Sequence, residues 1–340
     1  MKLILKTVLS CLVILALSGT PMDSVAQQHQ LHASLVKSKG YVVGSPLSRS
    51  GFHRLDSRED TTWSHIGWNV FGIAAFAIDP GNKDRIFLAG GNGVFRSLDG
   101  GESWKIVTGW EVTEGQGIAI DPANPNHVYV ATAYGVWSSF DGGETWEETN
   151  RGFSKTYTQN IAVDRIRAGR LVAATDAGIY ISERAEAWRR VTDDVPIMDI
   201  HQSNASPNLW AAATRGRGVW ISRDGADSWL EVRSRRVRGA HIHAVALDPT
   251  NEKKMAAGGW QTGVLISNDG GMSWKRVTKN LPSTNIYEMV FDPDNPGRLY
   301  VATIEEGVVF TDNDGRSWES AGMHGTLFFD MQFVDMEATQ

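Results

Sequence analysis

Residues 93–104 read Gly-Val-Phe-Arg-Ser-Leu-Asp-Gly-Gly-Glu-Ser-Trp, and this stretch returns along the chain. Close copies are GVWSSFDGGETW, GVWISRDGADSW and GVLISNDGGMSW, which end at Trp146, Trp229 and Trp274. Weaker copies end at Trp188 and Trp318, and successive tryptophans of the series are 41 to 45 residues apart. A repeat of this period indicates an architecture made of several small, similar units.

Five of these six repeats also hold a second shared element upstream of the tryptophan. It is a short apolar run that ends in aspartate, at Asp79, Asp121, Asp164, Asp248 and Asp292. Between the two elements lie β-rich runs such as RIFLAGG and HVYVATA. One unit therefore contains about four short strands joined by Gly, Asn and Asp turns, which is the content of one propeller blade.

The two ends of the chain supply a seventh unit. Residues 41–44, 51–54 and 61–63 match the second, third and fourth strands of a blade, and residues 328–335 match the missing first strand. We therefore expect an all-β, seven-bladed β-propeller of four-stranded blades. A C-terminal inner strand would complete the N-terminal three-strand blade, which leaves no exposed sheet edge. The expected organisation is a leader over 1–26, a linker over 27–40 and the propeller over 41–340.

The composition and the N-terminal sequence restrict the class of protein and its expected cellular location. The 340 residues are 41% hydrophobic and 21% charged, which is ordinary for a globular protein. The net charge of −6 argues against nucleic acid as a partner. Residues 1–26 have the basic start, apolar stretch and small-residue cleavage site of a secretory signal peptide, cleaved near Ala26. We expect a secreted or periplasmic monomer without a membrane span, and the only cysteine, Cys11, lies in the leader.

The repeated S-x-D-x-G-x-[ST]-W boxes resemble Asp-box (BNR) repeats. Similar repeats occur in sialidases, xyloglucan-active glycoside hydrolases, the sortilin luminal domain and photosystem II assembly factors, and the resemblance implies a propeller of the WD40/YVTN-like kind. We interpret the boxes as structural, because the carboxylate can accept N–H groups of its own turn while the indole packs between sheets. The box residues are Asp99, Trp104, Asp141, Trp146, Asp224, Trp229, Asp269, Trp274 and Trp318. The repeat ending at Trp188 lacks the Asp and both glycines, so its turn should be irregular.

Polar residues precede the apolar part of the innermost strands. When these strands are aligned on their terminal Asp, the large face is apolar one and three residues before it and polar five and seven residues before it. The polar residues are Glu114, Gln116, Tyr157, Gln159, His241, His243, Asn285 and Tyr287, with Asp330 in the closing strand. They predict a ligand surface at one mouth of the central channel. The alternative is a channel that is merely hydrated.

Loops expected on the same rim add charged and aromatic groups. Arg215 and Arg217 suit carboxylate, sulfate or phosphate groups, whereas Trp260 suits a sugar face or a peptide. Glu305 lies in the matching loop of a neighbouring repeat. The alternative for the arginines is an ordinary solvated face.

Enzyme signatures are mostly missing. There is no Arg-Ile-Pro motif as in sialidases, and one propeller is present where the xyloglucan-active enzymes pair two. His241 and His243 could begin a metal site, but no third ligand is visible, so no metal or other cofactor is expected. We therefore favour an exported, non-catalytic binding or scaffold protein for a protein, peptide or glycan. The alternative is a glycoside hydrolase of sialidase-like or xyloglucan-active type, in which Glu114 would pair with Asp330 or Glu305.

Overall fold

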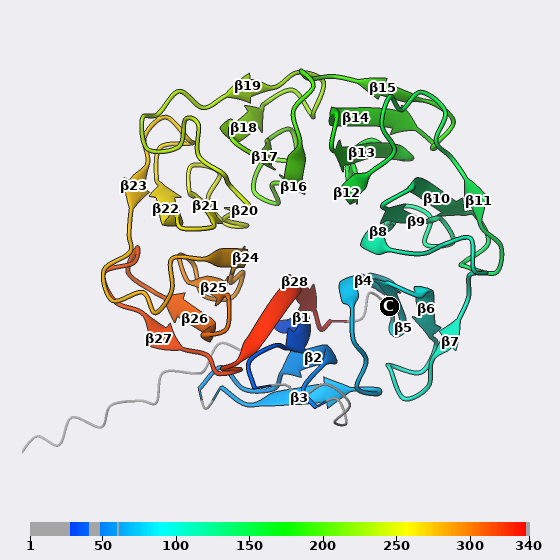
Figure 1. The fold of residues 1–340 in the computed structure, drawn as a ribbon, viewed down its shortest axis with the longest axis horizontal. Helices are drawn as coiled ribbons and strands as arrows, with labels where there is room; N and C mark the ends of the chain where they lie inside the picture. Colours follow the sequence, from blue (N-terminus) through cyan, green and yellow to red (C-terminus); the bar gives the residue numbers. More distant parts are fainter. Residues whose placement is uncertain (1–27, 41–47, 60, 338–340) are drawn as a thin grey trace, which may run out of the picture.

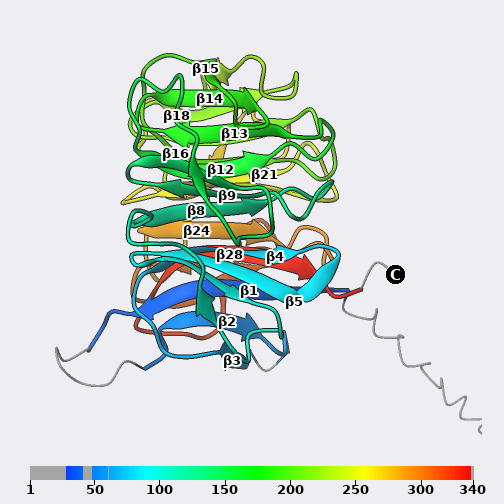
Figure 2. The same ribbon diagram turned by 90° about the vertical axis from the view of Figure 1, so that its right-hand side faces the viewer.

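The computed structural model describes residues 28–40, 48–59 and 61–337, and these residues form strands and turns without a helix. Seven four-stranded antiparallel sheets are arranged in a ring (Figure 1). The strands run from one face of the ring to the other, so the connecting turns gather on two opposite faces (Figure 2). The fold is a seven-bladed β-propeller, as the repeats predict.

Each blade contributes one strand to each of four concentric layers. The innermost strands are β4 (Ile73–Asp79), β8 (Gly115–Ile120), β12 (Thr158–Val163), β16 (Ile197–Gln202), β20 (Ala244–Leu247), β24 (Ile286–Phe291) and β28 (Thr326–Asp335). The second strands are β5 (Asn82–Gly90), β9 (Val128–Thr132), β13 (Arg170–Thr175), β17 (Trp210–Thr214), β21 (Met255–Gly259), β25 (Leu299–Thr303) and β1 (His29–Lys37). We number the blades one to seven in this order.

The outer two layers follow the same order of blades. The third strands are β6 (Gly93–Ser97), β10 (Gly135–Ser139), β14 (Gly178–Glu183), β18 (Gly218–Ser222), β22 (Gly263–Ser267), β26 (Gly307–Thr311) and β2 (Gly51–Leu55). The outermost strands are β7 (Lys105–Ile106), β11 (Glu147–Glu148), β15 (Trp188–Arg190), β19 (Leu230–Glu231), β23 (Lys275–Arg276), β27 (Glu319–Ser320) and β3 (Trp63–Ile66).

Blade seven joins the two ends of the chain, as expected, but its second strand differs from the prediction. β28 pairs along its length with β1, from His29 opposite Asp335 to Lys37 opposite Thr326. β1 lies in the segment 27–40 for which the sequence predicts a linker, so the propeller begins before residue 41. The proposed strand at 41–44 lies outside the described residues. Leu31, Ala33 and Leu35 make β1 a strand because they bury one face in the core shared with blade six.

An ion-pair network fastens this closing blade to blade six. The Arg58 guanidinium lies 3.2 Å from Asp292 Oδ1 and 3.0 Å from Asp294 Oδ2, and it also donates to the backbone oxygen of His29. The His29 Nδ1 atom lies 2.7 Å from Asp294 Oδ1. Because Arg58 and both carboxylates are almost fully buried, the network depends on all three charges being present.

The repeated boxes form the turns between third and outermost strands, and their carboxylates are used by the turns themselves. In blade one, Asp99 Oδ1 accepts the Ser97 hydroxyl at 2.7 Å and the Ser103 N–H at 2.9 Å. The hydrogen bonds from the Ser103 hydroxyl and N–H lower the pKa of Asp99 to about 2. Trp104 donates its indole N–H to the Gly101 oxygen of the same turn. These contacts support the structural interpretation of the boxes.

Blade three has the expected exception. Its turn is one residue shorter between the serine and the tryptophan, and Arg184 and Ala185 adopt φ angles of 55° and 59° without glycine. The Trp188 indole donates to the Thr149 oxygen of the preceding blade instead of to its own turn. The turn is therefore irregular, but the indole still packs in the core between blades two and three.

Candidate functional site

A bulge near the start of the innermost strands places one extra residue toward the central channel. The pairing of β8 with β9 skips Gln116, that of β12 with β13 skips Gln159, and that of β24 with β25 skips Tyr287. The pairing likewise skips Ala74, Met198 and Phe329 in three other blades, and in blade five the aligned residue is His243, which directly precedes β20. We call this the bulge position. Because a bulge interrupts the alternation of the strand, the bulge residue and the residue after it can face the same cavity, as Met198 and Asp199 do.

The bulge residues surround a cavity of about 270 Å³ at one end of the channel. We call this cavity the mouth. Its lining includes Glu114, Gln116, Gln159, Met198, His243 and Tyr287. The Tyr287 ring also contacts Phe329 edge-on, with centroids 5.9 Å apart. The mouth is therefore walled by amide, imidazole and phenol groups together with apolar side chains, which is the mixture that small ligand sites use.

Five of the sequence-predicted ligand residues meet at the mouth and the others do not. Glu114, Gln116, Gln159, His243 and Tyr287 line it, and Asp330 lines a second cavity deeper in the channel. The remaining candidates line neither cavity; they are Tyr157, His241, Asn285, Arg215, Arg217, Trp260 and Glu305. Trp260 is nevertheless 59% exposed, in the turn between β21 and β22. These residues can contact only a ligand that extends beyond the mouth onto the rim.

Two of the rim residues have contacts within the protein that explain their presence. Arg217 forms ion pairs with Glu231 and Asp193, and its guanidinium lies 5.1 Å from the Trp220 ring centroid. Asn285 Oδ1 accepts the backbone N–H of Gln261 and so braces a neighbouring turn. Arg217 and Asn285 therefore have structural roles that do not require a ligand.

The interior of the channel carries a second group of polar residues, of which the sequence analysis named only Asp330. The second cavity, of about 450 Å³, is lined by all seven innermost strands. Its lining includes small residues such as Ala75, Ala119 and Ala246, together with larger apolar side chains. Its polar lining includes Asn160, His201, Asp330 and Gln332, and Asp199 and Glu288 line the adjoining mouth. A signal for them exists in the sequence, because they replace alanine or glycine at aligned positions of the other repeats.

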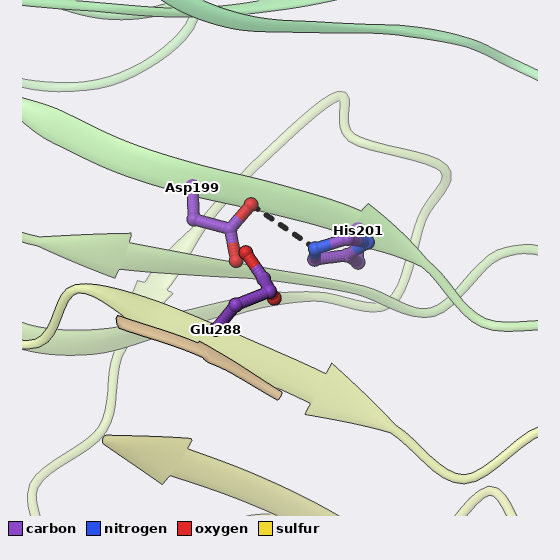
Figure 3. A group of neighbouring side chains, drawn as sticks. All are labelled: Asp199, His201 and Glu288. Atoms are coloured by element: carbon purple, nitrogen blue, oxygen red, sulfur yellow. Dashed lines mark ion pairs between the residues drawn. The ribbon is translucent and has the colours of Figure 1, made fainter. Parts of the chain in front are cut away.

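Asp199 is the best-anchored member of this interior cluster (Figure 3). Its Oδ1 accepts the Asn160 amide at 3.0 Å and the Ile200 N–H at 2.8 Å, and its Oδ2 accepts the Val245 N–H at 3.0 Å. The His201 Nε2 atom lies 3.0 Å from Asp199 Oδ1. Asp199 is only 5% exposed, and its carboxylate accepts hydrogen bonds from groups of blades three, four and five.

The charges of this cluster are strongly coupled. Burial opposes the ionisation of Asp199 and of His201, but their mutual attraction outweighs it, lowering the pKa of Asp199 and raising that of His201. Burial and the nearby carboxylates Asp199 and Asp330 raise the pKa of Glu288 well above its usual value. Burial also raises the pKa of Asp330 to about 6. The channel therefore gathers more carboxyl groups than it has cationic groups to neutralise them.

The sequence matches no protein-family model and no curated protein, whereas the fold resembles several solved structures. The GH74 enzyme of Niastella koreensis has a TM-score of 0.69 at 17% identity and is matched over 85% of this chain and 52% of its own. The GH74 xyloglucanase of Xanthomonas campestris has a TM-score of 0.63 at 17% identity, over 84% of this chain and 50% of its own. The chain thus spans about half the length of these enzymes.

A third neighbour is comparable to this chain in extent. YCF48 in complex with a D1 peptide has a TM-score of 0.57 at 14% identity, and the match covers 75% of this chain and 87% of YCF48. YCF48 of Cyanidioschyzon merolae gives a TM-score of 0.54 at 15% identity. At these identities the likeness extends to the fold alone.

Proposed function

We propose that the protein is a non-catalytic binding or scaffold protein that takes up an extended peptide segment at the mouth. The observation that carries this proposal is the ring of bulge residues. Gln116, Gln159, His243 and Tyr287 face a cavity in which a side chain of a partner would fit. A bulge that re-aims side chains toward a cavity is a feature often found beside binding sites.

The rim around the mouth offers surface for the rest of such a segment. Trp110, Tyr134 and Trp260 are 90%, 57% and 59% exposed in turns on this face. The Tyr134 hydroxyl lies 3.5 Å from Glu114 Oε1, which connects the rim to the wall of the mouth. Exposed aromatic rings around a polar pocket are typical anchor points for polypeptide partners. The binding of a peptide by YCF48 supports this choice of ligand, since its fold is similar.

The test is to select peptides on an array with the full mature chain and to measure the affinity of a selected peptide by calorimetry. Tyr287→Ala and His243→Ala should each weaken binding by at least about tenfold, as expected for central contacts. Phe140→Ala is the matched control, because Phe140 is an exposed aromatic residue in a box turn on the opposite face. Unchanged affinity in both mouth variants would contradict the proposal.

The second candidate function is glycoside hydrolysis. It is favoured by the carboxyl groups of Glu288 and Asp330, whose pKa values are raised by burial as a general acid requires. Glu288 lines the mouth, however, whereas Asp330 lines the inner cavity, so a polysaccharide would have to enter the channel to meet both. Release of sugar from xyloglucan or chromogenic glycosides, abolished by Glu288→Gln, would replace the binding proposal with this one.

We further propose that the protein is exported. The support is the signal-peptide pattern of residues 1–26, which lie outside the described residues. In the part of the chain that the structure describes, no helix is long and apolar enough to cross a membrane. Expression of the full chain followed by N-terminal sequencing should give a mature protein that starts near Gln27, and a retained Met1 would contradict export by this route.

A further inference from the structure

Three side chains in the channel present metal-ligating atoms to one another. Asp199 and His201 lie on β16 of blade four, and Glu288 lies on β24 of blade six (Figure 3). One donor atom from each residue lies within 4.8 Å of the other two. We infer that this triad binds a divalent transition-metal cation between the mouth and the inner cavity.

The donor set fits such a cation. One imidazole and two carboxylates suit Zn²⁺ and Mn²⁺, whereas Mg²⁺ and Ca²⁺ prefer oxygen ligands alone. In the tetrahedral geometry that Zn²⁺ prefers, bonds of about 2.0–2.2 Å place the ligand atoms about 3.3–3.6 Å apart. The three donor atoms lie within 4.8 Å of one another, so an inward movement of about 1 Å by one side chain completes the geometry. Glu288 is the flexible member, because one of its oxygens is held only by the adjacent Met289 N–H.

The surroundings orient Asp199 as metal sites orient their ligands. The Asn160 amide and the Ile200 N–H donate hydrogen bonds to Asp199 Oδ1. These bonds fix the orientation of the Asp199 carboxylate relative to Glu288. Fixed partners of this kind hold ligating carboxylates in place and raise metal affinity. Blade five supplies only Ala244 and Ala246 at the aligned channel-facing positions, which leaves the space between blades four and six open.

The repeats of the molecule provide an internal comparison. At the position of Asp199 and Glu288, three other blades have Ala75, Gly117 and Ala244. At the position of His201, four other blades have alanine. Because alanine or glycine occupies this position in three blades, and Asn160 and Asp330 occupy it in the remaining two, the strand itself does not require a polar side chain here.

The balance of charge favours a bound cation. Asp199, Glu288 and Asp330 all face this part of the channel, and His201 is the only imidazole in ion-pair contact with them among the described residues. Glu288 has no ion-pair partner in the part of the chain that the structure describes. A divalent cation held by neutral His201 would balance the charges of Asp199 and Glu288, and Asp330 would remain beside the site as a further carboxylate.

The site would keep open positions. His201 lines the inner cavity, while Asp199 and Glu288 line the mouth. Three protein ligands beside free space are typical of sites that also bind water or a ligand group, in contrast to closed four-ligand structural sites. The cation would therefore be accessible from the mouth.

The experiment is calorimetry of the chelator-treated full mature chain with ZnCl₂ and MnCl₂, with CaCl₂ as the comparison ion. One ion per chain is expected for Zn²⁺ or Mn²⁺, with Ca²⁺ much weaker. Glu288→Gln and His201→Asn should each weaken the affinity by at least about tenfold. His241→Asn and Glu305→Gln are the matched controls and should leave it unchanged, because both residues lie outside the two cavities.

The variants remain interpretable because Glu288→Gln conserves volume and its folding can be checked by the melting temperature. Zn²⁺ should raise the melting temperature of the wild type and of both controls, but not that of Glu288→Gln. Absence of binding by the wild type at millimolar metal would overturn the inference, and so would equal binding by the wild type and both triad variants. Peptide binding at the mouth is measured separately, so either proposal can fail without the other.

Discussion

The imidazole of His243 lies against the phenol ring of Tyr287, with ring centroids 4.2 Å apart, and its Nδ1 lies 3.2 Å from the Tyr287 backbone oxygen. This contact joins the inner strands of blades five and six at the mouth. It fixes the orientation of both side chains before a ligand arrives, which reduces the entropy that binding costs. The pair is therefore a pre-oriented part of the proposed peptide site.

The first prediction concerns the pH dependence of binding through His243. Burial lowers the pKa of His243 from 6.5, and the opposing influence of Asp199 and the Tyr287 oxygen is weaker, while Arg215 adds to the lowering. The imidazole should therefore stay neutral from about pH 8 down to its unperturbed pKa. Peptide affinity should be constant over that range and change only at lower pH. Calorimetry at a series of pH values tests this, with His243→Gln removing the change; a transition centred above pH 6.5 would contradict it.

The second prediction concerns the ion pairs that close the ring. Arg58→Ala leaves the buried carboxylates of Asp292 and Asp294 without their cation, which should lower the free energy of unfolding by about 3–5 kcal/mol. Arg54→Ala is the control, since its ion pair with Asp56 is largely exposed and should contribute less than about 1 kcal/mol. Urea denaturation measures both, and equal losses would show that the network has no special role.

The third prediction concerns the closing strand itself. Deletion of residues 327–340 removes most of β28, leaves β1 with an unpaired edge and exposes the core that Phe328 and Met331 bury. The truncated chain should accumulate as aggregate, whereas deletion of residues 338–340 alone leaves β28 complete and should be harmless. A soluble long truncation with the wild-type melting temperature would contradict ring closure.

The fourth prediction concerns the box tryptophans. Trp274 is 6% exposed and donates its indole N–H to Gly271 at 3.0 Å, so Trp274→Ala should cost about 3–5 kcal/mol of stability. Trp110→Ala is the matched control, because this indole is 90% exposed and its loss should change stability by less than about 0.5 kcal/mol. Thermal unfolding distinguishes the two, and comparable effects would contradict the packing role of the box.

Most of the fold was predictable because it repeats. The tryptophan series and the Asp-terminated runs define six blades, and the terminal segments define the seventh. The position of β1 was not predictable from the same pattern, since His32 and Ser34 occupy its second face and hide its apolar character. In the structure both are buried, with His32 stacked on Phe52 at 5.5 Å.

The residues of the mouth were partly predictable because the inner strands of the repeats can be aligned. Gln116, Gln159, His243 and Tyr287 emerge from an alignment anchored on the terminal Asp of each inner strand. Blade four has Ser203 at that position, so its inner strand is left out of the alignment, together with Asp199 and His201. The serine performs the same task, because Ser203 Oγ accepts the Ser206 N–H just as Asp121 Oδ1 accepts the Ala123 N–H. An alignment that allowed this exchange would have revealed the interior triad.

The last prediction concerns acid stability and His53 of blade seven, which is 1% exposed. Burial, reinforced by the neighbouring His65 ring at 4.7 Å, lowers the pKa of His53 from 6.5 to about 4. Between pH 6.5 and about 4, the unfolded chain binds a proton at His53 that the folded chain does not bind. The contribution of His53 to the free energy of unfolding is therefore full above pH 6.5 and is lost as the pH falls toward 4. The loss amounts to about 3 kcal/mol. His53→Gln should remove this part of the pH dependence in urea denaturation at pH 7 and pH 4, and an unaltered difference between the two pH values would show that His53 is protonated in the folded protein.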